Sequence, residues 1–129
     1  MQRIVFILCV PLSACVSDAA PPACVAMCEA AAALYGDCLT DWGADWSAAG
    51  YADEEDFLGA CETWGWEMSL LEADAVDRGT EAARGSVART CRSRRAAFAD
   101  PDASCDAYTG TDWNARPWDD TAEDDTGGT

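Results

Sequence analysis

Hydrophobic residues recur every three or four positions over residues 23–39, which is the spacing of one face of an α-helix. The apolar face consists of Cys24, Met27, Cys28, Ala31, Leu34, Tyr35 and Cys38. Glu29 and Asp37 fall on the opposite side, and a run of alanines between them favours a helix. Pro22 suits the first helical position. The pattern predicts a helix over 23–39 that buries three cysteines.

Two further long segments show helical patterns. After an irregular loop over 39–52, Asp53 is a good helix N-cap, and the acidic residues 54–56 suit the first turn. We prefer this capping role to calcium binding. The apolar face of this second helix is Phe57, Cys61, Trp64 and Met68. One or two helical turns are expected over 69–79, followed by a third long helix over 80–99. Its apolar face holds Ala83, Val87, Cys91 and Phe98.

A short fourth helix and a tail complete the expected fold. Pro101 suits the first turn of a helix over 101–108, which would hold Cys105. Residues 111–129 are acidic, rich in threonine and glycine and poor in aliphatic residues, which is typical of a largely disordered tail. We expect disorder beyond about residue 119, with two tryptophans, Trp113 and Trp118, folding back on the domain. The predicted fold class is all-α: a small disulfide-stapled helical bundle of three main helices plus a short fourth, with a disordered acidic C-terminal tail.

The first fifteen residues follow a different pattern. Arg3 is followed by apolar residues 4–10 and then by Leu12-Ser13-Ala14-Cys15. A positive charge, an apolar run and small residues in this order are typical of a secretory signal. Leu-Ser-Ala-Cys also resembles the lipobox of bacterial lipoproteins, and this resemblance implies that Cys15 is lipidated and becomes the first mature residue. The alternatives are an ordinary secretory signal with Cys15 unmodified, or a buried N-terminal helix.

The resemblance implies a domain organisation and a location. The signal peptide would be 1–14, a polar tether 15–22, the disulfide-rich helical domain 23–110, and the acidic tail 111–129. The anchored protein would lie on the extracytoplasmic side of a bacterial membrane, the outer membrane where there are two, held by acyl chains such as palmitate on Cys15. No run of 18 or more apolar residues occurs, so we expect attachment by lipid alone. The resemblance does not extend into the mature domain.

Six cysteines remain after the signal peptide and Cys15 are set aside. An even number in an exported chain of this size indicates three disulfides. A zinc site is disfavoured because the chain has no histidine and no second close cysteine pair. Six cysteines allow 15 connectivities. An up-down-up bundle favours one of them. It joins Cys24 to Cys91, Cys28 to Cys61 and Cys38 to Cys105.

Charge narrows the range of partners. The chain has 24 acidic and 8 basic residues, a net charge of −16, and neither lysine nor histidine. Such a chain repels nucleic acid, so no nucleic-acid partner is expected. Helical geometry places Arg94 within the apolar face of the third helix. A buried arginine needs a compensating partner, so we predict an ion pair with a carboxylate there.

Candidate chemistry is sparse. Without histidine there is no Ser-His-Asp or Cys-His arrangement, and no glycine-rich phosphate loop or complete calcium-binding loop occurs. We therefore expect no cofactor, no metal site and no enzyme activity. Two alternatives remain, namely a small exported hydrolase that uses paired carboxylates and a calcium-dependent adhesin that uses the acidic tail.

The remaining signal is aromatic. Trp42, Trp46 and Trp66 have no clear place on a helical core face. One interpretation is that they cover the ends and loops of the bundle. The sharper one is a binding surface for an envelope glycan or a partner protein, because tryptophan rings supply rigid contact area. The sequence thus predicts a cell-envelope lipoprotein that acts as a non-catalytic binding or structural module.

Overall fold

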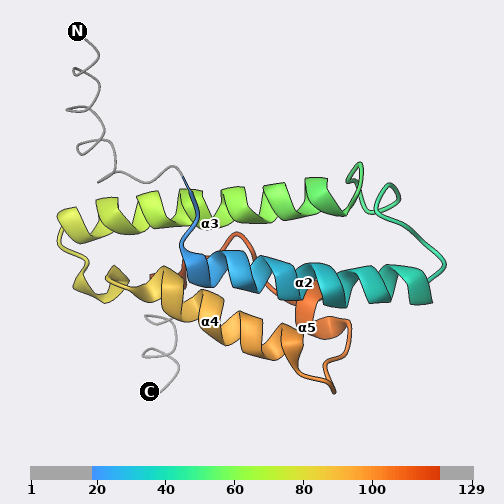
Figure 1. Cartoon of the computed structure of the whole chain (residues 1–129). Coiled ribbons are helices and arrows are strands. Elements are labelled where there is room, and N and C mark those ends of the chain that lie inside the picture. The colour runs from blue at the N-terminus through green and yellow to red at the C-terminus, as the bar shows by residue number, and fades with distance from the viewer. Residues whose placement is uncertain (1–18, 120–129) are drawn as a thin grey trace, which may run out of the picture.

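The computed structural model describes residues 19–119, so Cys15 and the predicted signal peptide lie outside the described residues. Three long helices dominate: α2 (Pro22–Asp41), α3 (Glu54–Asp77) and α4 (Ser86–Ala99). Two short elements, η1 (Glu81–Ala83) and α5 (Asp106–Thr109), follow α3 and α4 respectively. No strand occurs between residues 19 and 119. Figure 1 shows α2 between α3 and α4, with α3 running opposite to the other two. The all-α prediction is confirmed.

Helix α2 is the centre of the bundle because its apolar face is covered on two sides. Cys24, Met27, Cys28 and Ala31 are fully buried. They share one core with residues of α3 and α4, among them Phe57 and Val87. The helix predicted over 23–39 is therefore present and is slightly longer, from Pro22 to Asp41.

The same helix is apolar enough to resemble a membrane span. Within residues 19–119 it is the one helix whose length and composition would suffice, with a mean hydropathy of 1.3. That value comes largely from alanine and cysteine rather than from large aliphatic residues. Its place at the centre of the bundle accounts for this composition.

All three disulfides begin on α2. Cys24 bonds Cys91 on α4, Cys28 bonds Cys61 on α3, and Cys38 bonds Cys105 at the start of α5. The Cα atoms of the pairs lie 4.9, 5.8 and 6.0 Å apart, within the ordinary range for disulfides. The predicted pairing is confirmed. Loops of 67 and 33 residues are closed, which stabilises the fold by about 4 kcal/mol per bridge in the chain-entropy model.

Helix α3 does not stop where the sequence pattern suggested. Separate turns over 69–79 were predicted, but the helix is continuous to Asp77 because no helix breaker interrupts it before Gly79. Gly79 has a φ of 103°, a left-handed conformation that glycine adopts easily. The N–H groups of Gly79 and Thr80 donate to the carbonyls of Val76 and Ala75, the pattern of a Schellman motif. Glycine at this motif ends the helix.

The predicted capping of α3 is confirmed. Asp53 accepts a hydrogen bond from the Asp56 backbone N–H at 2.8 Å, and the Asp56 carboxylate accepts one from the Ala52 N–H at 2.9 Å. Both carboxylates therefore satisfy backbone donors at the start of α3.

Two other predicted boundaries were wrong. The third helix begins at Ser86 rather than at residue 80, because Gly85 adopts a φ of 75° and separates it from η1. The fourth helix is confined to α5, since residues 101–102 form a turn and 103–104 are irregular. In the described part of the predicted tail, residues 111–119, Trp118 is 7% exposed and Trp113 packs against the core, as expected for these two tryptophans. Residues 120–129 of the predicted tail lie outside the described residues.

The start of α4 is capped from another helix. Glu72 of α3 accepts hydrogen bonds from the backbone N–H groups of Gly85 and Val87 at 2.9 and 3.0 Å. Gly85 is the N-cap residue and has no side chain, so it cannot supply this acceptor itself. One carboxylate therefore joins α3 to α4 and also neutralises the positive end of the α4 dipole.

Replacing Glu72 by alanine should destabilise the fold. The change leaves two backbone donors without their acceptor, and we expect the free energy of unfolding to fall by about 1–2 kcal/mol. Denaturant unfolding at neutral pH measures this quantity. The matched control is Glu67→Ala on the exposed side of the same helix, which should change it by less than about 0.5 kcal/mol. Equal effects of the two changes would contradict the capping role.

Helices α2 and α3 are in close contact at Gly65. A Cβ atom placed on this residue would lie 2.9 Å from the Cβ of Cys24 and 3.3 Å from the Cβ of Ala20. Cys24 cannot move away freely because it is bonded to Cys91. Glycine is therefore required here by the distance between the two helices.

We expect Gly65→Ala to lower the free energy of unfolding by about 1–2 kcal/mol, because overpacking outweighs the better helix propensity of alanine. Gly59→Ala is the matched control, since nothing lies within 4 Å of a Cβ at that position. That control should raise the free energy of unfolding by up to about 1 kcal/mol. Thermal or denaturant melts of both variants decide the matter, and a stabilising Gly65→Ala would show that the helices are not in close contact there.

Candidate ligand-binding pocket

Aromatic residues from every part of the domain meet in one continuous group, which we call the aromatic cluster. Its members are Tyr35, Trp42, Trp46, Tyr51, Phe57, Trp64, Phe98, Tyr108 and Trp113. Tyr35 of α2 lies at its centre, stacked on Tyr108 of α5 with ring centroids 4.5 Å apart. The rings of Phe57 and Tyr108 are 5.9 Å apart. The cluster thus joins α2, α3, α4 and α5 to the loop before α3.

One disulfide and one hydrogen bond hold Tyr108 and Trp113 in place within the cluster. The Cys38–Cys105 bridge ties the start of α5 to α2 and so brings Tyr108 over the bundle. The indole N–H of Trp64 donates to the backbone carbonyl of Trp113 at 2.7 Å. This bond fixes the segment after α5 against α3, with the two indole rings edge to face at 5.2 Å.

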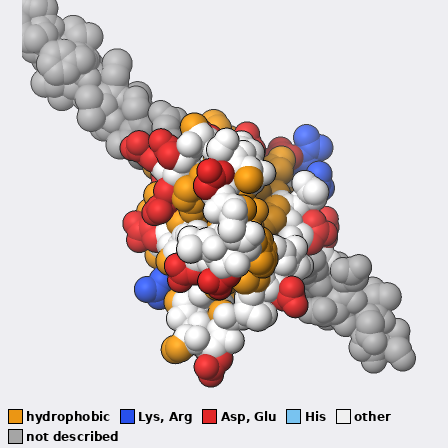
Figure 2. Space-filling model, turned by 90° about the vertical axis from the view of Figure 1, so that its right-hand side faces the viewer, with side chains coloured by type: hydrophobic (Ala, Val, Ile, Leu, Met, Phe, Trp, Pro, Cys, Tyr) orange, Lys and Arg blue, Asp and Glu red, His pale blue; other side chains and the backbone are white. Residues whose placement is uncertain are grey.

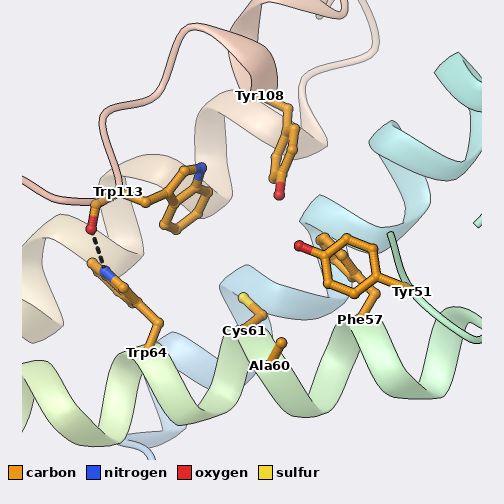
Figure 3. A pocket seen from close by; sticks show the side chains of 7 residues that line it. All are labelled: Tyr51, Phe57, Ala60, Cys61, Trp64, Tyr108 and Trp113. Atoms are coloured by element: carbon orange, nitrogen blue, oxygen red, sulfur yellow. Dashed lines mark hydrogen bonds between the residues drawn. The ribbon is translucent and has the colours of Figure 1, made fainter. Parts of the chain in front are cut away.

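A pocket of about 230 Å³ opens within this cluster. It is lined by Tyr51, Phe57, Ala60, Cys61, Trp64, Tyr108 and Trp113. Figure 3 shows Ala60 and Cys61 on the α3 side, Trp64 and Trp113 together at one side, and Tyr51 with Phe57 at the other. The hydroxyl groups of Tyr51 and Tyr108 both point toward the pocket. Its walls are therefore aromatic and uncharged, with two hydroxyl groups as polar contacts.

Partial burial makes the Tyr108 phenol harder to ionise than an exposed one. Its partial burial, together with the neighbouring Tyr51 and Tyr35, raises the pKa of the phenol well above its ordinary value. The hydroxyl therefore remains protonated at physiological pH and can both donate and accept a hydrogen bond. Tyr108 thus offers the pocket a neutral ring and a polar group.

Arg94 contacts the tryptophans that form one side of the pocket. The guanidinium carbon lies 5.2 Å from the ring centroid of Trp64 and 4.9 Å from that of Trp113. The Nη2 atom donates to the carbonyl of Asp112 at 3.4 Å. These are cation–π contacts that helical patterning did not indicate. The carboxylate ion pair predicted for Arg94 stays a prediction.

The three tryptophans proposed as a binding surface occupy different surroundings. Trp42 is 55% exposed at the end of α2, with its ring edge to face against Tyr35. Trp46 is half-buried and packs on Phe57 at 4.9 Å between ring centroids. Trp66 lines a separate groove with Val25 at the start of α2. The structure thus places Trp42 and Trp46 in the aromatic cluster and Trp66 in this separate groove.

Five carboxylates in the described residues cap helices or form ion pairs. Asp53, Asp56 and Glu72 cap helices, as shown above. Asp74 and Glu81 form exposed ion pairs with Arg78 and Arg84 at 2.8 and 2.6 Å. No group of three metal-ligating side chains occurs within residues 19–119.

Patterning along the chain did not locate the pocket. Trp64 was expected on the buried face of its helix, but Tyr51 and Tyr108 carried no periodic signal because a loop and a four-residue helix supply them. The Cys38–Cys105 pairing was the available clue, since it brings the segment around Tyr108 back to α2. No protein-family model matches this chain, and no curated protein or solved structure matches it either.

The raised pKa of Tyr108 predicts a loss of stability in alkali. Because the folded state holds this proton more tightly, its stabilising contribution is complete below the unfolded pKa of about 10 and is lost as the pH rises through the folded value. Tyr108→Phe cannot ionise, so its free energy of unfolding should fall less between pH 8 and about pH 11. Denaturant unfolding of both proteins at the two pH values measures the difference. Parallel losses would show that Tyr108 does not titrate with folding.

Proposed function

We propose that this chain is a lipid-anchored protein of the bacterial cell envelope, whose helical domain acts as a non-catalytic binding or structural module. The observation that carries the proposal is the combination of three disulfides from one helix with a lipobox-like run at Cys15. Disulfides persist in oxidising compartments, which for a bacterium lie outside the cytoplasm. Lipidation of Cys15 would hold the domain at a membrane surface there.

The length of chain between Cys15 and the domain supports this arrangement. Helix α2 begins at Pro22, seven positions after Cys15. An extended segment of that length spans roughly 25 Å. The tether contains two prolines and no large hydrophobic side chain after Val16. It would let the folded domain stand clear of lipid headgroups.

A binding role is supported by the aromatic surface. The pocket offers rigid rings and two hydroxyl groups, and Trp42 adds an exposed indole at the same end of α2 as Tyr35. Such rings supply large contact areas with little loss of side-chain entropy. The partner would be an envelope glycan, another envelope protein or a small molecule of the same compartment.

Intact mass of the membrane-extracted protein under non-reducing conditions tests the anchor and the compartment together. We expect a chain that begins at Cys15, carries at least two acyl chains and has six hydrogens fewer than its reduced form. One acyl chain alone would bind a membrane only marginally. Cys15→Ser is the matched control and should lose the acyl mass and the membrane association. An unmodified Cys15, or six free thiols, would contradict the proposal.

A further inference from the structure

Three rings of the pocket form a corner rather than a flat stack. Tyr51 and Phe57 are nearly perpendicular, with an interplanar angle of 84° and centroids 5.2 Å apart. Phe57 and Tyr108 are inclined at 59° with centroids 5.9 Å apart. Figure 3 shows Tyr51 and Phe57 on one side of the pocket and Tyr108 across from α3, with both hydroxyl groups turned inward. A guest in this corner would meet ring surface from several directions.

Ring faces carry negative electrostatic potential and attract cations. The cluster already holds one, since Arg94 lies over Trp64 and Trp113. Arg94 does not line the pocket, whereas Tyr51, Phe57 and Tyr108 do. Phe57 is only 2% exposed, so the partly exposed rings of Tyr51 and Tyr108 are the part of the pocket available to a second cation.

The charge of the molecule favours a cationic guest over an anionic one. The chain has a net charge of −16, and Figure 2 shows acidic side chains spread around the end of the bundle, with hydrophobic side chains between them. Asp56 precedes the pocket residue Ala60 by four positions and so lies on the same face of α3, with its carboxylate bonded to the Ala52 N–H. A field of this sign raises the local concentration of cations and repels anions.

The lining of the pocket narrows the chemical class further. Its lining residues include no charged side chain, so a metal ion or a primary ammonium would lose strong hydration without a carboxylate to replace it. A quaternary ammonium is weakly hydrated and presents methyl groups, which suit aromatic walls. Ring faces stabilise its positive charge, and no hydrogen-bond acceptor is required because the nitrogen carries no hydrogen. The pocket volume of about 230 Å³ suits a small head of this kind rather than a drug-sized ligand.

We propose that the pocket is a binding site for a small, free organic cation with an N-methylated ammonium group, held by the rings of Tyr51 and Tyr108, with the buried ring of Phe57 behind them. The inference rests on the proposed function only in taking the domain to be a binding module. It requires neither Cys15 nor lipid.

Choline and its uncharged analogue 3,3-dimethylbutan-1-ol provide the direct test, because the two have nearly the same shape and differ in charge. The probe protein is the full-length purified chain in a non-ionic maltoside detergent, which carries no ammonium group. Titration is followed by tryptophan fluorescence, since Trp64 and Trp113 line the pocket, and by calorimetry against matched sodium chloride. We expect choline to bind at least about tenfold more tightly than the alcohol, and more weakly as salt increases.

Variants locate the site. Tyr51→Leu removes one ring but keeps an apolar side chain, and should weaken choline binding about three- to thirtyfold. Tyr51→Phe keeps the ring and should retain binding. Leu70→Ala changes an exposed hydrophobic side chain that does not line the pocket, and should leave the affinity unchanged. Circular dichroism and thermal melts establish that each variant is folded.

Several results would overturn the inference. They are equal affinity for choline and the alcohol, no response to choline, or choline binding that Tyr51→Leu leaves intact in a folded protein. Saturable binding of N-acetylglucosamine in place of choline would also overturn it and would identify a sugar site instead. If Tyr51→Leu does not fold, the comparison of the two ligands on the unaltered chain remains decisive. Intact mass of the same sample reports the anchor, so failure of the cation site and failure of the lipoprotein proposal are distinguishable.

Discussion

The constraint on which the rest of the structure depends is the set of three disulfides that leave one helix. Cys24, Cys28 and Cys38 lie along a single buried face of α2, and each bonds a different segment of the chain. Once these bonds form, α4, α3 and α5 can pack only around α2. The core between them is built largely from alanine, cysteine and a few larger side chains, so hydrophobic burial alone would be modest for a domain of this size. Covalent constraint of the unfolded chain compensates for that thin core.

The aromatic cluster depends on the same bonds. Tyr108 belongs to a helix of four residues, which has little stability of its own. Its place against Tyr35 follows from the neighbouring Cys38–Cys105 bridge, and the Trp64 to Trp113 hydrogen bond holds the chain that follows. The pocket is therefore a consequence of two long-range restraints on a segment with little secondary structure. Reduction of Cys38–Cys105 would release one side of the pocket while leaving the α2–α3 and α2–α4 bridges in place.

Periodicity in the sequence was sufficient to predict the long helices and, through their order and direction, the disulfide pairing. It failed where a single residue overrides the pattern. Gly85 separates α4 from the residues before it. Periodicity also failed after Met68, where the chain stays helical to Asp77 although the spacing of apolar residues weakens. The carboxylate of Glu72 that caps α4 is thirteen residues from Gly85 and carries no local signal. The pocket was also not predictable from local patterns, because its rings are brought together by tertiary contacts and not by spacing along one helix.

The surface of the domain is acidic, whereas the pocket in the aromatic cluster is lined by uncharged side chains, and this difference in charge bears on what the pocket could bind. The chain is strongly acidic, yet the lining of the pocket has no charged side chain, and the protein's own Arg94 is a cation that contacts the cluster. Burying an arginine against two indole rings costs less desolvation than burying it among aliphatic side chains, because the ring faces partly replace the lost hydration. The rings of Tyr51 and Tyr108 that line the pocket have the same physical property. An acidic field brings cations toward the domain, and aromatic walls without carboxylates discriminate against the strongly hydrated ones. Charge and lining together therefore define a narrower class of ligand than either feature does alone.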